Sequence, residues 1–337
     1  MKLQELDTLS SFALFGPGWQ SDNGAWTLYT DLEPHDGSDG LVLLGFEEQV
    51  EAACTWRHSE PRAVHPLFEI QTSMCSARIS MEGYDSAVRA IHEAIALGDV
   101  YQVCLTRQAQ FAPCSGASIL AALCARSVPT YAAWVRLPDG RELVSGSPEL
   151  FFRIHEGLVH TMPMKGTAPL DREEALDASE KERAELAMIT DLLRNDLRAV
   201  CAPKSIRVLD ARMKVRLPYA VQTVSHIVGE VAEGMQAREV LAALHPGGSI
   251  TGAPKQAARA QIAELEPTPR GLYTGALGFI RGADTVFSLL IRTAVKSAQG
   301  WSYGVGGGIT IDSDAEDEWA EMMVKLSAVC ASVELVP

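Results

Sequence analysis

Tyr84–Thr106, YDSAVRAIHEAIALGDVYQVCLT, joins a helix pattern directly to a strand pattern. Apolar residues recur at helical spacing between Ala87 and Ile95, and Gly98-Asp99 is typical of a helix end. The β-branched and aromatic residues of 100–106 predict a strand immediately afterwards. The stretch therefore predicts a fold that mixes helices with strands.

The sequence before this stretch has a different pattern. Turn-forming runs such as Gly16-Pro17-Gly18 separate short strand-like pieces at 26–29 and 41–44. We therefore expect residues 1–80 to form a short strand-and-turn region packed on the main fold, and residues 81–337 to form the main domain.

The sequence after this stretch continues the mixture. A helix is expected after Ser179, because Ser179 and Glu182 have the spacing of a capping box, and another after Asp312-Ser313-Asp314. Strands are expected at 131–136, 142–146, 149–154, 205–209, 221–231 and 285–295. Grouped strands with interspersed helices predict the α+β class.

Composition narrows the functional classes. The 337 residues are 47% apolar, and 29 basic against 43 acidic residues give a formal net charge of −14, which repels nucleic-acid phosphates and anionic lipid. No run approaches the ~18 apolar residues of a membrane span. Met1–Asp7 is acidic where a signal peptide is basic, and the seven cysteines are scattered without a C-x-x-C pair. We therefore expect a cytoplasmic protein with reduced cysteines that binds neither nucleic acid nor membrane.

Three glutamates occupy unusual helical positions. Glu185 shares the apolar stripe of its helix, and Glu318 and Glu321 lie one turn apart on the last helix. One interpretation is structural: an acid at the rim of the core or paired with arginine, and acids favoured by a helix N-terminus. The other is a site for a hard cation such as Mg²⁺, which takes carboxylate ligands.

Two glycine-rich segments and one lysine are open to two interpretations as well. Residues 247–255 and 304–308 match no nucleotide-binding fingerprint, and their glycines suit either plain turns or backbone binding of a carboxylate. Lys165, in the sequence MPMKGT, is either an exposed lysine or, in a desolvated site, a nucleophile.

Taken in order, these pieces resemble the chorismate-utilising enzyme family, which includes the large subunits of anthranilate and aminodeoxychorismate synthases and the isochorismate and salicylate synthases. The matches run from about residue 84 to 331: GDVYQV (98–103), SPE (147–149), KGT (165–167), KERAE (181–185), DLLRNDL (191–197), GSITGAPK (248–255), RGLYTG (270–275), IRT (291–293) and GGI (307–309), followed by Glu318, Glu321 and Lys325. Cys104 departs from the asparagine that is usual at its position.

The resemblance implies a large αββα sandwich of the anthranilate synthase type with a central active-site cleft. It implies Mg²⁺ held by Glu185 and Glu318 with Glu321 in support, and Glu149 as the general acid for the C4 hydroxyl of chorismate. The substrate-binding residues that it implies are Thr167, Gln222, Thr251, Tyr273, Arg292, Gly306, Gly307, Gly308 and Lys325.

Three positions distinguish between the members of this family. Isochorismate and salicylate synthases have a water-activating lysine where this chain has Gln102, and a neutral amide cannot act as that base. Anthranilate synthases have an eliminating histidine that aligns with Gln222. Lys165 matches the amine nucleophile of aminodeoxychorismate synthases, where the other members have alanine.

The resemblance therefore implies amination of chorismate at C4 by ammonia, through attack of Lys165 at C2, in para-aminobenzoate and folate biosynthesis. An unprotonated Lys165 is required, which partial desolvation and a nearby Mg²⁺ would favour. The chain has no glutaminase nucleophile motif, so a separate glutamine amidotransferase subunit is expected to supply ammonia. The alternatives are an anthranilate synthase large subunit and a non-catalytic chorismate-binding subunit.

Overall fold

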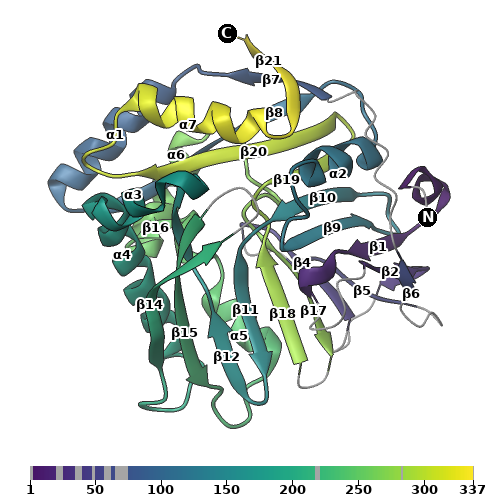
Figure 1. The fold of residues 1–337 in the computed structure, drawn as a ribbon, viewed down its shortest axis with the longest axis horizontal. Coiled ribbons are helices and arrows are strands. Elements are labelled where there is room, and N and C mark those ends of the chain that lie inside the picture. Colours follow the sequence, from purple (N-terminus) through teal and green to yellow (C-terminus); the bar gives the residue numbers. More distant parts are fainter. Residues whose placement is uncertain are drawn as a thin grey trace.

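The computed structural model describes residues 3–19, 26–34, 40–47, 50–56, 62–64, 75–216, 221–281 and 284–336. Within these residues, two large β-sheets lie face to face with helices on their outer sides, which is the αββα arrangement expected from the resemblance (Figure 1).

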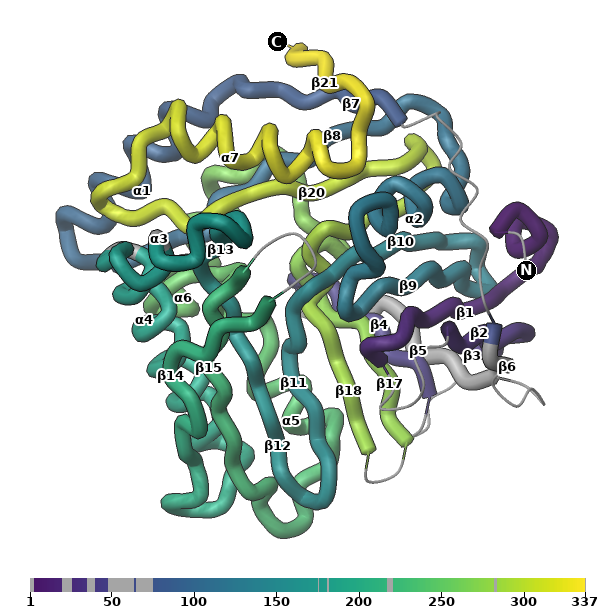
Figure 2. The backbone as a smooth tube through the Cα atoms, viewed as in Figure 1, coloured from purple at the N-terminus to yellow at the C-terminus, as the bar shows by residue number. Residues whose placement is uncertain are grey.

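The first sheet holds strands from the whole length of the chain. In spatial order its described strands are β21 (Cys330–Val336), β7 (Cys75–Ser80), β8 (Gln102–Phe111), β20 (Gly300–Ile309), β19 (Thr293–Ser297), β10 (Glu142–Ser147), β9 (Tyr131–Arg136), β1 (Phe12–Phe15), β2 (Trp26–Thr30) and β6 (Arg62–Val64), with β16 (Gly252–Ala253) paired to β8. The two described ends of the chain lie at different ends of this sheet (Figure 2).

The second sheet is antiparallel along its described strands. In spatial order these are β13 (Met164–Ala168), β15 (Val221–Glu230), β12 (Leu158–Thr161), β11 (Leu150–His155), β18 (Asp284–Leu289), β17 (Ala276–Arg281), β4 (Gly40–Leu44), β5 (Val50–Trp56) and β3 (Leu32–Pro34), with β14 (Arg207–Arg216) paired to β15.

The helices cover the outer faces. On the first sheet, α1 (Tyr84–Leu97), α6 (Lys255–Leu265) and α7 (Ala315–Ser327) contact β8, β20 and β21, and α2 (Gly116–Cys124) contacts β9 and β10. On the second sheet, α3 (Glu173–Ala178) and α4 (Glu180–Leu197) contact β13, and α5 (Ala237–Leu244) packs on α4. Short 3₁₀ turns, η1 (Leu3–Thr8), η2 (Pro17–Trp19), η3 (Leu170–Arg172) and η4 (Gly248–Ile250), complete the described elements. Among the helices in the described part of the chain, none is both long and apolar enough to cross a membrane.

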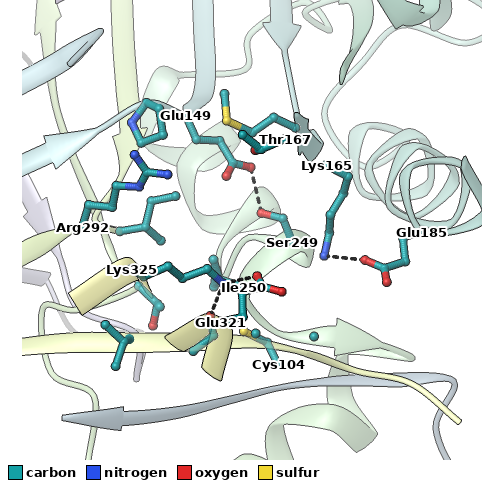
Figure 3. A pocket seen from close by; sticks show the side chains of 18 of the residues that line it. Cys104, Glu149, Lys165, Thr167, Glu185, Ser249, Ile250, Arg292, Glu321 and Lys325 are labelled. Atoms are coloured by element: carbon teal, nitrogen blue, oxygen red, sulfur yellow. Dashed lines mark hydrogen bonds and ion pairs between the residues drawn. The ribbon is translucent and has the colours of Figure 1, made fainter. Parts of the chain in front are cut away.

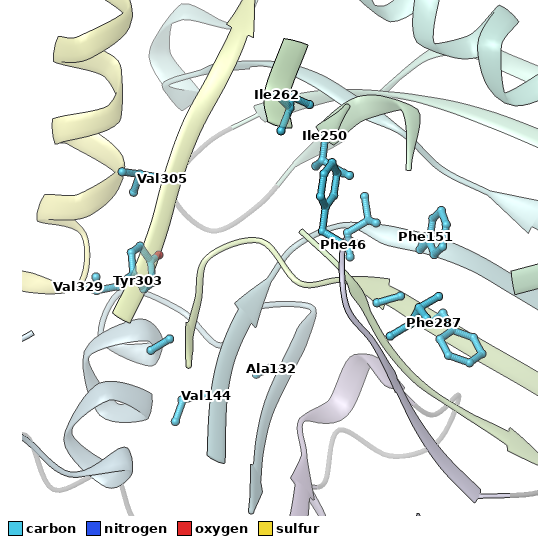
Figure 4. Packing of buried hydrophobic residues seen from close by; sticks show 14 of the residues in the cluster. Phe46, Ala132, Val144, Phe151, Ile250, Ile262, Phe287, Tyr303, Val305 and Val329 are labelled. Carbon is cyan, nitrogen blue, oxygen red and sulfur yellow. The ribbon is translucent and has the colours of Figure 1, made fainter. Parts of the chain in front are cut away.

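The core joins the N-terminal strands to the rest of the fold. Phe15 on β1 packs edge-on against Phe279 on β17, with ring centroids 5.5 Å apart, so the two sheets meet through aromatic side chains. A larger buried cluster extends from Tyr303 and Val305 on β20 toward Ile250 (Figure 4). Strands from residues 1–80 lie in both sheets; the predicted division of the chain near residue 80 stays a prediction.

Most elements predicted from the sequence are present, with two differences. The single strand expected at 285–295 is two strands, β18 and β19, which belong to different sheets. Arg292 lies between them with a left-handed φ of 50°. The glycine cluster 304–308, which suggested a turn or a loop, lies inside strand β20.

Candidate active site

A cavity of about 320 Å³ lies between the two sheets. Side chains from β13, α4, α7 and the loop after β10 converge on it, as Figure 3 shows for Lys165, Glu185, Lys325 and Glu149. All of the site residues predicted from the sequence line this cavity except Thr251. The site is therefore built from both sheets and from helices on opposite sides of the sandwich.

Lys165 lies on β13 and forms an ion pair with Glu185 on α4. Its Nζ is 3.1 Å from Oε2 of Glu185, and the two side chains are only 17% and 13% exposed. Burial lowers the pKa of Lys165, but the Glu185 carboxylate more than offsets this, so the pKa lies above its usual value. This differs from the expectation that desolvation would favour a neutral amine: in the free protein Lys165 is an ammonium.

Glu149 follows β10 and is buried, with 5% of its surface exposed. Its Oε1 accepts a hydrogen bond of 2.9 Å from the Ser249 hydroxyl. Burial raises the pKa of Glu149 to about 7, against the opposing effects of the Ser249 hydrogen bond and the charge of Lys165. A carboxyl with this pKa can hold a proton near neutral pH and donate it to a leaving group.

The α7 carboxylates have partners of two kinds. Glu318 is buried and accepts a 2.7 Å hydrogen bond from the Ser313 hydroxyl, whereas Glu321 forms a 2.7 Å ion pair with Lys325. Within the part of the chain that the structure describes, no three His, Cys, Asp or Glu side chains lie close enough together to form a metal cluster.

The donor chemistry nevertheless fits Mg²⁺. Glu185, Glu318 and Glu321 line one cavity and offer only carboxylate oxygens, and Mg²⁺ is usually bound by one or two carboxylates together with water and substrate oxygens. The role of these three residues as ligands stays a prediction.

The glycines of β20 expose main-chain donors to the cavity. Gly306 lies opposite Thr106 and Gly308 opposite Cys104. The amides of Thr106 and Cys104 donate away from β20, to Glu266 and to the carbonyl of Thr251.

These are therefore pairs of the non-hydrogen-bonded kind, and Gly306 and Gly308 turn their N–H and C=O groups away from β8. The Lys325 ammonium, 2.8 Å from the Gly306 carbonyl, occupies this side. Gly307 has the opposite orientation, so its amide faces β8 rather than the cavity, contrary to the expectation that all three amides are available.

Close packing explains the glycine cluster. A Cβ at position 304 would lie 2.3 Å from the Tyr273 ring, and one at position 308 would lie 1.9 Å from Nε2 of Gln102. Any side chain at these positions would displace a residue beside the cavity. The Tyr273 ring therefore requires glycine at position 304, whereas at position 308 the end of the flexible Gln102 side chain would have to move.

Two predicted substrate-binding residues need comment. Thr251 is fully buried and donates to the Gly247 carbonyl at 2.8 Å, so it supports the loop beside the cavity instead of lining it. Gln222 on β15 does line the cavity, where its amide donates to the Thr167 hydroxyl at 3.2 Å. Gln102 is 2% exposed and is not part of the cavity wall.

Several residues that line the cavity were not assigned a role from the sequence, and three of them carry polar or reactive side chains close to the assigned ones: Ser249, Glu182 and Cys104. Ser249 lies within the glycine-rich segment 247–255, but only the fold brings its hydroxyl to Glu149. Glu182 lies one helical turn before Glu185, a spacing that could have indicated it. Cys104 had been noted only as a departure from the family pattern, and it lines the cavity.

Comparisons with known proteins identify the family of the chain. A family model described as chorismate binding enzyme matches residues 17–331. Aminodeoxychorismate synthase component 1 of Bacillus subtilis is 36% identical over 270 residues, which are 77% of this chain and 57% of that protein. Anthranilate synthase component 1 of Streptomyces coelicolor is 35% identical over 269 residues, 77% of this chain and 52% of that protein. The chain thus spans little more than half the length of these two relatives.

The fold has solved counterparts as well. A 2,3-dihydroxybenzoate-specific isochorismate synthase from Bacillus anthracis superposes with a TM-score of 0.78 at 20% identity, over 97% of each chain. At this identity the likeness concerns the fold. The match of the family model along nearly the whole sequence, together with the relatives above 30% identity, shows that the chain belongs to the chorismate binding enzyme family.

Proposed function

We propose that the chain aminates chorismate at C4 with ammonia and yields 4-amino-4-deoxychorismate. The observation that carries the proposal is the position of Lys165, a buried lysine whose ammonium enters the cavity opposite Glu149 (Figure 3). The similarity to aminodeoxychorismate synthase component 1 supports it.

In the proposed first step, the Lys165 amine forms a bond to C2 of chorismate. The electrons of the ring diene shift, the C4–O bond breaks, and Glu149 gives its proton to the departing hydroxyl, which leaves as water. Because Lys165 is protonated in the free protein, it must release its proton to solvent before attack. In the second step, ammonia bonds to C4 and the diene shifts back as the C2–N bond breaks, which returns Lys165 as a neutral amine. The ammonium formed at C4 then gives one proton back to the Glu149 carboxylate. The enolpyruvyl group stays in place.

Substrate carboxylates would be received by the cationic and main-chain donors of the cavity. Arg292 offers a guanidinium that suits a carboxylate, and the amides of Gly306 and Gly308 point to the open edge of β20. Tyr273, Thr167 and Lys325 line the same cavity. A magnesium ion bound by Glu185, Glu318 and Glu321 would supply positive charge to polarise the ring carboxylate.

The two glutamines support amination over related reactions. Gln102 is neutral and lies outside the cavity wall, so it does not supply a base for attack of water at C2. Gln222 lines the cavity but has no titratable group to assist elimination of pyruvate. The ammonia would come from a separate glutamine amidotransferase subunit, and the product would serve para-aminobenzoate and folate biosynthesis in the cytoplasm.

The test is mass-resolved product analysis after incubation of the purified chain with chorismate, Mg²⁺ and excess ammonia at alkaline pH, beside Lys165→Ala. We expect an amine that retains the enolpyruvyl group, with a loss of product in the variant of at least about 10²-fold, because covalent catalysis is removed. Anthranilate as the product, unaffected by the substitution, would instead identify an anthranilate synthase. Chorismate binding without turnover would indicate a non-catalytic subunit.

A further inference from the structure

A buried arginine outside the cavity wall bonds to several segments that form it. Arg270 is 3% exposed and does not line the cavity. Its Nε and Nη2 donate to the two carboxylate oxygens of Glu266, at 2.8 and 2.7 Å, and Glu266 is the last residue before the loop that leads to Arg270. The guanidinium lies over the Phe46 ring, 4.3 Å from its centroid.

The remaining donors of Arg270 reach residues of the cavity wall. Nη2 donates to the Cys104 carbonyl at 2.6 Å, and Nη1 donates to the Ile250 carbonyl at 2.7 Å and to the Thr274 hydroxyl at 3.3 Å. Cys104, Ile250 and Thr274 all line the cavity. An arginine has five N–H donors, so this arrangement uses all of them, which a lysine with three donors on one atom cannot reproduce.

Glu266 extends the same network to β8. Its Oε1 accepts from the Thr106 amide at 2.8 Å. This bond keeps the Thr106 amide turned away from β20, and Gly306, directly opposite, is thereby left with its own amide facing the cavity. The Arg270–Glu266 ion pair is therefore hydrogen-bonded to β8, the strand that lies beside the glycines of β20.

We propose that Arg270, held by Glu266, is a positioning residue that fixes the η4 turn, which contains Ser249, relative to β8. In this way Arg270 keeps the Ser249–Glu149 hydrogen bond and the β20 glycines in place for chorismate. Ser249 precedes Ile250, whose carbonyl Arg270 binds, and the Ser249 hydroxyl donates to Glu149. The inference rests on the proposed function for its kinetic consequences, but its effect on chorismate affinity does not depend on which product forms.

The chain contains a matched control, Arg136 on β9. Arg136 also binds backbone carbonyls, those of Asp7 and Leu9 at 3.2 and 3.0 Å, also pairs with a buried glutamate, Glu142 at 3.1 Å, and also lies over a phenylalanine ring, Phe12. None of these partners lines the cavity. Arg136→Lys and Arg270→Lys are thus the same chemical change at two similar sites, one beside the cavity and one away from it.

The experiment measures kcat and KM with ammonia, and melting temperature, for the wild-type chain and both variants. Chorismate affinity is measured by calorimetry without ammonia in the same three chains carrying Lys165→Ala, so that no covalent adduct forms during the titration. We expect Arg270→Lys to lower kcat/KM by between about tenfold and a hundredfold, because small displacements in a site have effects of this size. Arg136→Lys should keep kcat/KM within about twofold of the wild-type value, even if its melting temperature falls.

The pH profile adds a readout that a purely structural role would not change. The Ser249 hydrogen bond lowers the pKa of Glu149, so a displaced Ser249 should move the Glu149-dependent limb of the kcat profile to higher pH in Arg270→Lys and leave it unchanged in Arg136→Lys. Glu266→Gln, which keeps an acceptor for Thr106 but removes the charge pair, should shift the profile in the same direction and serves if Arg270→Lys does not fold.

The outcomes are distinct. Equal affinity, kinetics and pH profile in folded Arg270→Lys and Arg136→Lys would overturn the positioning role. Wild-type binding of chorismate without amine formation would refute the proposed function, and the affinity comparison would still test Arg270. A wild-type chain that does not bind chorismate would overturn both.

Discussion

Glu149 and Glu185 line the same cavity, yet their surroundings differ. Glu149 lies on the loop between β10 and β11 and has a neutral partner, the Ser249 hydroxyl, whereas Glu185 lies on α4 and has a cationic partner, Lys165. Burial raises the pKa of Glu149 to about 7 although the Ser249 hydrogen bond opposes this, whereas Glu185 forms an ion pair with the Lys165 ammonium. Two glutamates in one cavity can therefore have different roles: Glu149 can supply a proton at one wall, and Glu185 compensates the charge of Lys165 at the other.

Replacing Glu149, which is hydrogen-bonded to the neutral Ser249 hydroxyl, should have the largest effect on turnover. Glu149→Gln keeps the size and the Ser249 contact but has no proton to give, so we expect amine formation to fall by between about 10²- and 10⁴-fold. Steady-state kinetics measure this loss, and calorimetry should find chorismate affinity nearly unchanged. Wild-type turnover in Glu149→Gln would show that Glu149 is not the general acid.

Replacing the ion-paired carboxylate, Glu185, should lower stability as well as turnover, because Glu185 is also a proposed Mg²⁺ ligand. Glu185→Gln leaves the Lys165 ammonium buried without its charge partner, and we expect a loss of about 3–5 kcal/mol in the free energy of unfolding. Urea denaturation measures it. The double variant Lys165→Met/Glu185→Gln, which removes both charges, should recover most of this loss. Additive losses in the double variant would contradict the ion pair as the cause.

The raised pKa of Glu149 should appear in the pH dependence of stability. Between the usual carboxyl value of 4.5 and about 7, the folded protein keeps a proton that the unfolded chain releases, so its free energy of unfolding falls as pH rises. Relative to Glu149→Gln, the wild-type chain should lose about 3 kcal/mol between pH 4.5 and 8. Parallel stability curves for the two proteins would show that Glu149 is ionised in the fold.

The smallest effect is expected from the partner of Glu149. Ser249→Ala removes a hydrogen bond that lowers the pKa of Glu149, so this pKa should rise above about 7. We expect a loss of about tenfold or less in kcat, together with a shift of the upper limb of the pH profile to higher pH. Ser313→Ala, which removes the corresponding hydroxyl partner of Glu318, should leave that limb in place.

The sequence predicted α1, α4 and α7 because the signals at their ends are local, whereas α2, α3, α5 and α6 were not predicted. Ser179 caps α4 by accepting a hydrogen bond from the Glu182 amide at 3.2 Å, as the capping spacing indicated, and Asp314 caps α7. The motifs also identified site residues that, with the exception of Thr251, line the cavity. These signals depend on neighbours within a few positions.

The features that the sequence did not predict depend on distant parts of the chain. The residues of 285–295 are mostly β-branched or apolar and contain no glycine or proline, so the pattern did not reveal the change of sheet at 290–292, where Arg292 adopts a left-handed backbone. The β20 glycines resembled a turn because the approach of Tyr273 and Gln102 is not visible locally. The Ser249–Glu149 hydrogen bond joins residues a hundred positions apart. The hydrogen bonds of Arg270 likewise connect β8, η4 and the loop that contains Thr274.

The central claim is that Lys165 forms a covalent bond to chorismate. The most direct measurement is intact-protein mass spectrometry with peptide mapping after incubation with chorismate and Mg²⁺ in the absence of ammonia. We expect an adduct on the peptide of Lys165 with the mass of chorismate less one water, lost on addition of ammonia and absent from Lys165→Ala. Amine formation by Lys165→Ala at the wild-type rate, with no adduct in the wild-type chain, would contradict it.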